Sequence, residues 1–139
     1  MGVRANQLEF SHSYLEMAEI KIKCADLLLV KNFYADAISR SYYAAYLSAQ
    51  AVLILLGEEP KTDQESLQLF SLKLVKTQIV KPRYAKNFQW LMNAWQESDH
   101  NPLNWFVEED AQNALKQAKT FLARMKTLHT QLSSQDHKN

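Results

Sequence analysis

Three side chains that could do chemistry together share one face of a segment in the first third of the chain. Asp36, Arg40 and Tyr43 are spaced four and three residues apart, which places them on one side of a helix. Arginine offers a planar fork of donors that fits a phosphate, and a tyrosine ring can stack on a base or a ribose. The same spacing also permits a plain surface ion pair between Asp36 and Arg40, so the pattern alone leaves both interpretations open.

A second polar cluster, Asp99-His100-Asn101, stands in the last third of the chain, directly before Pro102. Histidine can act as a general acid or base near neutral pH, and an ordinary loop histidine is the alternative interpretation. The sequence holds no glycine-rich phosphate loop, no zinc-ligand spacing and no serine elbow. We therefore expect neither a metal nor a cofactor.

The elements that must position these residues are helices. Only two glycines and three prolines occur in 139 residues, and this scarcity of turn residues favours long helices joined by few loops. Apolar side chains recur every three or four residues in five segments. The spacing predicts an all-α domain over 1–139, with a frayed tail at 133–139. The helices are expected over about 6–30, 33–56, 63–76, 83–98 and 107–132.

Local signals predict where the second helix ends, where the third begins and which side chains face inward. Gly57 is placed to end the second helix in a left-handed conformation. Thr62 is expected to cap the third helix, with Glu65 three residues later as the partner in a capping box. The apolar stripe of the second helix includes Tyr42, which leaves Arg40 and Tyr43 for a ligand or a partner.

Charge is nearly balanced over the whole chain but uneven along it. The formal net charge is +1, from 16 basic and 15 acidic residues, too little to hold nucleic acid by overall charge. Residues 61–86 hold six basic and two acidic residues, and 96–110 hold five acidic and no basic ones. These are either solvated helix faces or, for 61–86, a guide for a phosphate backbone or an acidic partner.

Targeting signals are not visible in the sequence. It shows no secretory signal and no apolar stretch long enough for a transmembrane helix, so a cytoplasmic protein without membrane contact is expected. Cys24 is the only cysteine, which excludes an internal disulfide.

The second helix also carries a resemblance. The run 34–46, with Ser39-Arg40-Ser41-Tyr42-Tyr43 at its centre, resembles the small stand-alone HEPN domains of bacteria and archaea, as do Gly57 and Lys61-Thr62 after it. Looser matches at Asp99 and 107–111 extend the resemblance over nearly the whole chain. It implies an up-and-down antiparallel bundle of about five helices that usually dimerises.

Many domains of that family are toxins or defence ribonucleases that cut RNA without a metal. Others bind RNA or a nucleotide, or partner a minimal nucleotidyltransferase that silences them. Active members carry an arginine followed, after four to six residues, by a histidine. Here Trp95 stands at the place of that arginine, and Asp99-His100 stands where Asp-Tyr is usual in a related group. The one literal match to the spacing, Arg124 with His129, lies on the last helix and is interpreted as chance.

Three hypotheses remain open. The favoured one is an RNA- or nucleotide-binding HEPN-like homodimer of a toxin–antitoxin or defence system, acting with a nucleotidyltransferase and with little or no catalysis. The second is a metal-independent endoribonuclease with Arg40, His100 and Asp99 as catalytic residues, in which a dimer brings two His100 loops together. The third is a structural helical adaptor. The residues expected to bind RNA or nucleotide are Asp36, Arg40, Tyr43, Lys61 and Asn101.

Overall fold

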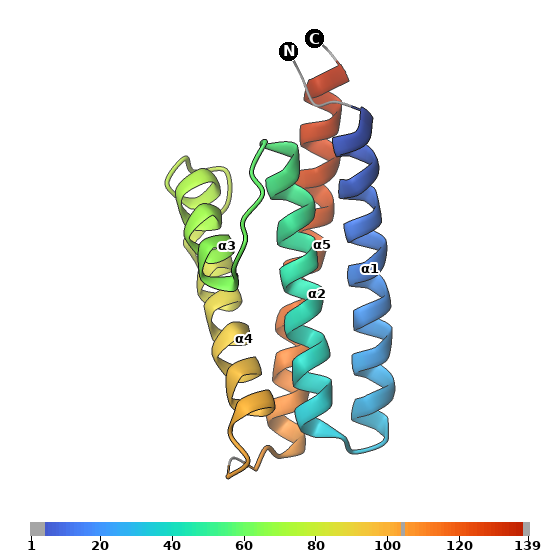
Figure 1. Cartoon of the computed structure of the whole chain (residues 1–139). Coiled ribbons are helices and arrows are strands. Elements are labelled where there is room, and N and C mark those ends of the chain that lie inside the picture. The colour runs from blue at the N-terminus through green and yellow to red at the C-terminus, as the bar shows by residue number, and fades with distance from the viewer. Residues whose placement is uncertain (1–4, 104, 138–139) are drawn as a thin grey trace.

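The chain folds as a bundle in which the long helices run alternately down and up, whereas the short third helix runs in the same direction as the second because the link between them returns along the bundle (Figure 1). A computed structural model describes residues 5–103 and 105–137, and no strand occurs among them. The helices are α1 (Ala5–Val30), α2 (Tyr34–Leu55), α3 (Asp63–Phe70), α4 (Pro82–His100) and α5 (Glu108–His137), with a π-helical turn, η1 (Ser71–Val75), after α3. The predicted all-α fold of about five helices is confirmed.

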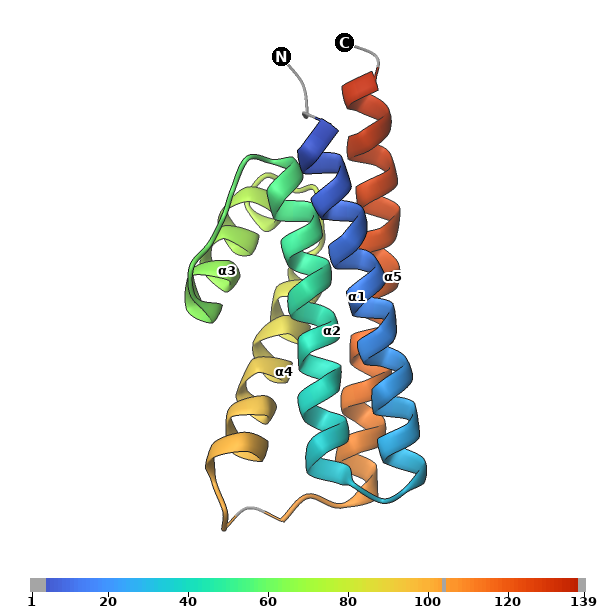
Figure 2. The same ribbon diagram turned by 45° about the vertical axis from the view of Figure 1, so that its right-hand side comes forward.

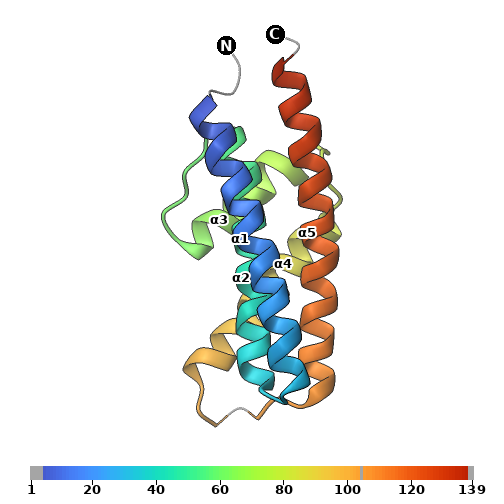
Figure 3. The same cartoon turned by 90° about the vertical axis from the view of Figure 1, so that its right-hand side faces the viewer.

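Helix α2 occupies the centre of the bundle. It packs against α1, α3, α4 and α5, whereas α1 touches only α2 and α5. Figures 2 and 3 show α1, α2 and α5 as three long neighbouring rods, with α3 and α4 flanking the other side of α2. Small side chains let helices approach closely, and α2 buries five alanines: Ala37, Ala44, Ala45, Ala49 and Ala51.

The core is made of the stripes that the spacing predicts. Tyr42 and Ile38 on α2 are fully buried, as are Phe88 on α4 and Phe121 on α5. Phe70 at the end of α3 joins the last two, with ring centroids 5.4 to 5.8 Å apart. Each aromatic side chain of this size dominates the burial energy of its region, so this cluster fixes α3 and α4 against α5.

The turn between α2 and α3 has the predicted glycine stop and the predicted threonine cap. Gly57 has φ +81° and donates its amide to the Ile54 carbonyl, and the Glu58 amide reaches back to Leu53. Thr62 caps α3 by accepting the amide of Glu65 at 3.1 Å. The link therefore leaves α2 in a fixed direction and delivers Asp63 to the flank of α2.

Three expected helix boundaries are wrong. The third helix does not continue as an α-helix to residue 76, because the backbone widens into η1 and then turns at Gln78, which has φ +65°. Helix α4 includes Asp99 and His100, which were expected in a loop, because Asn101 rather than Asp99 ends it. Helix α5 continues through 133–137, where no glycine or proline stops it. Residues 138–139 lie outside the described part.

Among the described residues, no helix is long and apolar enough to cross a bilayer.

Candidate functional site

Stacked aromatic rings form the base of a site between α2 and α4. The indole of Trp95 lies parallel to the buried ring of Tyr42, with centroids 4.6 Å apart and planes 14° apart. Tyr43 meets the same indole edge-on at 5.8 Å. Trp95 is half-buried against the core, as its place on the apolar stripe predicts. The platform is therefore held by packing from two helices.

The carboxylate of Asp99 ties the two helices together above this platform. Its Oδ2 accepts the indole N–H of Trp95 at 2.7 Å and the hydroxyl of Ser39 at 3.3 Å. Trp95 and Asp99 stand one turn apart on α4, whereas Ser39 is on α2. Charged acceptors form the stronger hydrogen bonds, so Asp99 sets the orientation of the indole and joins α4 to the first turns of α2.

Arg40 follows Ser39 on α2 and is exposed. It forms no hydrogen bond and no ion pair with any residue that the structure describes; in particular, no Asp36–Arg40 pair forms. Asp36 is exposed in the first turn of α2, where its charge favours the helix dipole. Tyr43 is half-buried, and its ring packs on Tyr42 and Trp95. Of the predicted face, Arg40 offers a cationic head that no described group engages.

His100 and Asn101 stand at the carboxyl end of α4. The exposed His100 ring meets the edge of Trp95, with centroids 5.7 Å apart, and has no hydrogen-bond partner among the described residues. Asn101 ends the helix: its amide group donates to Glu97 Oε2 at 2.9 Å, and its Oδ1 accepts the Leu103 amide at 3.0 Å. His100 is therefore available to a ligand, whereas the Asn101 side chain serves the helix end.

Lys61 is the one predicted site residue that the structure places elsewhere. It lines a hollow of about 220 Å³ on the link between α2 and α3, together with Tyr14 and Gln50. Gln50 lies ten residues beyond Arg40 on the same helix, which is about 15 Å along the axis. The structure thus brings Arg40, Tyr43, Asp99 and His100 to one end of α2 and α4, without Lys61.

Comparison with known proteins decides the family. Residues 11–128 match the HEPN domain. The chain belongs to the HEPN family. A Methanocaldococcus jannaschii protein named "Putative toxin MJ0605" is 28% identical over 112 residues, 81% of this chain and 83% of that protein. "Putative toxin MJ0142" of the same organism is 25% identical over 112 residues, 81% of this chain and 76% of the relative. The Pyrococcus horikoshii "UPF0332 protein PH1297" is 32% identical over 73 residues, about half of each chain.

One side chain that supports the site in this HEPN chain was missed by sequence reasoning. Asp63, which follows Lys61-Thr62 where the resemblance expects histidine, accepts a hydrogen bond from the Tyr42 hydroxyl. Burial, and then the Asp63 carboxylate, raise the pKa of Tyr42 far above its ordinary value. The same two causes, in that order, raise the pKa of Tyr46. A buried tyrosine hydroxyl needs a polar partner, and that requirement was the available signal.

The literal Arg-four-His match is not a site in this HEPN chain. Arg124 donates to the Ile79 carbonyl at 3.1 Å, whereas His129 Nδ1 lies 2.8 Å from the Ser11 hydroxyl. Ser11 gives its only proton to the Ala51 carbonyl at 2.6 Å, so His129 must be the donor to Ser11. A histidine that donates in this way cannot act as the base for that serine. Arg124 and His129 thus have separate partners, which agrees with the interpretation of the spacing as chance.

No group of three or more histidine, cysteine or acidic side chains is arranged to hold a metal ion within 5–103 and 105–137.

Proposed function

We propose that the chain is a toxin-type HEPN module that binds RNA at the corner of α2 and α4, with Arg40 as the main phosphate contact. The observation that carries the proposal is an exposed, unengaged Arg40 directly after Ser39, which Asp99 ties to α4. A guanidinium offers several donors to a phosphate. His100 and the edge of Trp95 supply an aromatic surface at the same end of the helices. The names of the relatives support the toxin class.

The contacts of Asp99 favour a positioning role. Its Oδ2 accepts both the Trp95 indole and the Ser39 hydroxyl, which ties α4 to α2, whereas among the described residues its Oδ1 has only the Ser98 hydroxyl at 3.5 Å. Trp95 occupies the place at which the family pattern has an arginine, so the arginine expected in a ribonuclease site of this family is missing from α4. The site therefore retains a phosphate contact and lacks a complete set of catalytic groups.

A metal-independent endoribonuclease that uses Arg40 and His100 is the second candidate. His100 favours it, since the imidazole is exposed, is positioned against Trp95 and has no hydrogen-bond partner among the described residues. Such a ring can donate or accept a proton near neutral pH. If this candidate is correct, expression of the chain arrests growth and His100→Ala abolishes the arrest.

Binding of fluorescently labelled single-stranded RNA, followed by anisotropy, tests the proposal. We expect Arg40→Gln to raise Kd about tenfold and to lower the slope of log K against log salt by about one. Lys116→Gln, an exposed cation on α5, is the matched control and should change neither. Equal affinity in wild type and Arg40→Gln would contradict the proposal. If the wild-type chain cleaves the RNA and the His100→Ala variant does not, the ribonuclease function would replace the binding function proposed here.

We further propose a nucleotidyltransferase as the protein partner, as the family resemblance implies. Where a gene for a minimal nucleotidyltransferase lies beside the gene for this chain, co-expression of the two should relieve any growth arrest and yield a complex that co-purifies. Failure of the two proteins to associate at micromolar concentration would refute this part without affecting RNA binding.

Helix α1 supports the proposal of a homodimer. Large apolar side chains are exposed along one stripe of it: Phe10 (56%), Met17 (45%), Ile20 (56%) and Leu27 (68%). Their spacing of seven, three and seven is that of a coiled-coil seam. In an antiparallel pair of α1 helices, Phe10 would face Leu27 of the partner subunit and Met17 would face Ile20 of the partner subunit. A second copy of this chain is thus a fitting occupant of the stripe.

Charges beside the stripe favour the same register. The register that pairs the apolar residues also sets Glu16 opposite Lys23 of the partner subunit, twice by symmetry. Because α4 does not touch α1, this dimer would keep the two His100 sites apart.

Sedimentation equilibrium tests the α1 dimer. We expect Ile20→Glu to give monomers, Glu16→Lys to weaken the dimer, and the swap Glu16→Lys with Lys23→Glu to restore it. A monomeric wild type at 100 µM, or a swap that weakens the dimer further, would exclude this interface.

A further inference from the structure

A basic hollow lies at the opposite end of α4 from the RNA site. It has a volume of about 580 Å³, within the range of small-molecule sites. Its walls come from η1, the connecting turn, the start of α4 and the middle of α5: Val75, Lys76, Gln78, Ile79, Val80, Lys81, Pro82, Arg83, Tyr84 and Arg124. Four of these residues are cationic and none is acidic. An anion is the ligand that such a lining favours.

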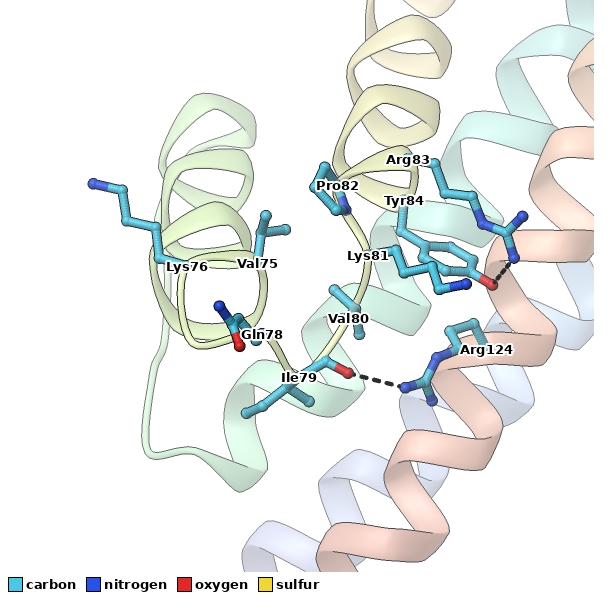
Figure 4. Close-up of a pocket in the computed structure, with 10 residues that line it drawn as sticks. All are labelled: Val75, Lys76, Gln78, Ile79, Val80, Lys81, Pro82, Arg83, Tyr84 and Arg124. Carbon is cyan, nitrogen blue, oxygen red and sulfur yellow. Dashed lines mark hydrogen bonds between the residues drawn. The ribbon is translucent and has the colours of Figure 1, made fainter.

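Three cations gather on one side of the hollow. In Figure 4, Lys81, Arg83 and Arg124 lie on the side of the Tyr84 hydroxyl, whereas Lys76 points away. None of these three forms an ion pair with any acid that the structure describes. Their charge is therefore not neutralised within the part of the chain that the structure describes.

Both arginines are held in place before a ligand arrives. Arg83 donates to the Tyr84 hydroxyl at 3.0 Å, with its guanidinium carbon 5.0 Å from the centre of that ring. Arg124 donates to the Ile79 carbonyl at 3.1 Å. Each contact uses part of a guanidinium and leaves other donors for a ligand. Such prior ordering reduces the entropy that binding costs.

The backbone around the hollow is also fixed and adds positive character. The amides of Ile79 and Val80 both donate to the Leu74 carbonyl, at 2.9 and 3.0 Å, which holds the turn in one shape. Helix α4 begins here with Pro82 at its first position, no acidic residue in its first turn and no side-chain cap from Lys81. The positive end of the helix dipole therefore reinforces the three cations.

We propose that this hollow binds a small molecule with linked phosphates, of the class of nucleoside di- and triphosphates. Arg124 approaches from α5, Arg83 from α4 and Lys81 from the turn before α4, so cations from separate parts of the wall can hold consecutive phosphates. The rest of the lining is largely apolar and can contact the ring system of such a ligand through Val75, Ile79, Val80 and Pro82. This site is separate from the RNA contact at Arg40, and its proposal does not depend on the proposed function.

Calorimetric titration of the full chain with ATP tests the inference. We expect a dissociation constant below 1 mM, competition by pyrophosphate and none by adenosine. Arg83→Gln and Arg124→Gln should each raise the dissociation constant for ATP at least tenfold, which is about 1.4 kcal/mol. Lys86→Gln removes a charge from the same helix outside the hollow and is the matched control, expected to bind as wild type does.

Three outcomes would overturn the inference. The first is no heat of binding with 1 mM ATP. The second is wild-type affinity in the Arg83→Gln and Arg124→Gln double variant, whose fold is checked by its melting temperature. The third is binding of single-stranded RNA but not of ATP or pyrophosphate, lost in the same variants, which would assign the hollow to an RNA strand.

Discussion

The hydrogen bond between Tyr42 and Asp63 makes a quantitative prediction about what holds α3 on the bundle. The Tyr42 ring is fully buried among aromatic neighbours, so Tyr42→Phe keeps the packing and removes the hydroxyl alone. A hydrogen bond to a charged group contributes about 1.5–3 kcal/mol. Asp63 is half-buried, so we expect the lower part of that range. The free energy of unfolding should fall by about 1.5–2 kcal/mol, and Tm by about 5–10 °C.

Urea denaturation followed by circular dichroism at pH 7 is the assay, and Tyr34→Phe is the matched control. The Tyr34 hydroxyl donates to Asn32 Oδ1 at 3.1 Å in an exposed setting, so its loss should cost less than about 0.5 kcal/mol. Asp63 also lies in the first turn of α3, where its charge favours the helix dipole. Asp63→Ala alone therefore mixes two effects, and a double-mutant cycle with Tyr42→Phe separates them.

The cycle should give a coupling energy of about 1.5 kcal/mol between Tyr42 and Asp63. The reasoning fails if the two substitutions add to within about 0.3 kcal/mol, or if Tyr42→Phe is no more damaging than Tyr34→Phe. Either result would mean that α3 is held by its apolar contacts alone.

Three further predictions concern pH and a turn. Tyr42 and Tyr46 have a pKa raised above 10.0 in the folded chain, so the free energy of unfolding should fall as pH rises beyond about 10. Urea titration should show a smaller fall in the Tyr42→Phe variant. Burial, helped by His12, lowers the pKa of His129 below 6.5; stability should therefore fall as pH drops below that value. His129→Asn should remove this loss, and an unchanged slope would contradict it. Gly57→Ala should lower the free energy of unfolding by about 1 kcal/mol, measured through Tm. The cost comes from the backbone, since φ is +81° and nothing lies within 4 Å of the added Cβ.

The sequence was a good guide to the packed faces and to the turn between α2 and α3, and a poor one to the segment after α3 and to the ends of α4 and α5. An apolar stripe with a period near 3.6 can be buried on one side only, so the inward positions of α2 and α5, such as Tyr42 and Phe121, were predictable. The stop at Gly57 was predictable because its position demands a left-handed residue. The widening at η1 was not, because Ser71–Val75 has ordinary helix-forming spacing and only the packing of the turn reveals the change.

The candidate site shows the same division. The position of Arg40 on an exposed face followed from spacing, and so did the burial of Tyr42. The role of Asp99 did not follow, because Ser39 lies sixty residues away and only the packing of α4 on α2 brings the two together. The sequence predicts Asp99 in a loop as a catalytic candidate, yet one turn of α4 places its carboxylate on the Trp95 indole. Contacts between distant segments are what a periodic pattern cannot specify.

The two proposed sites mark opposite ends of one rigid helix, and this arrangement constrains how they can communicate. Helix α4 has 19 residues, which at 1.5 Å per residue separates Arg83 from His100 by about 25 Å. A small phosphorylated ligand cannot span that distance, and Trp95 and Phe88 pack α4 into the core between the ends. Coupling would therefore require α4 to move as a unit against α2, which would strain the bond between Asp99 and Ser39. If ATP alters RNA affinity, Ser39→Ala should weaken the effect, and an effect unchanged in Ser39→Ala would place the coupling outside this contact.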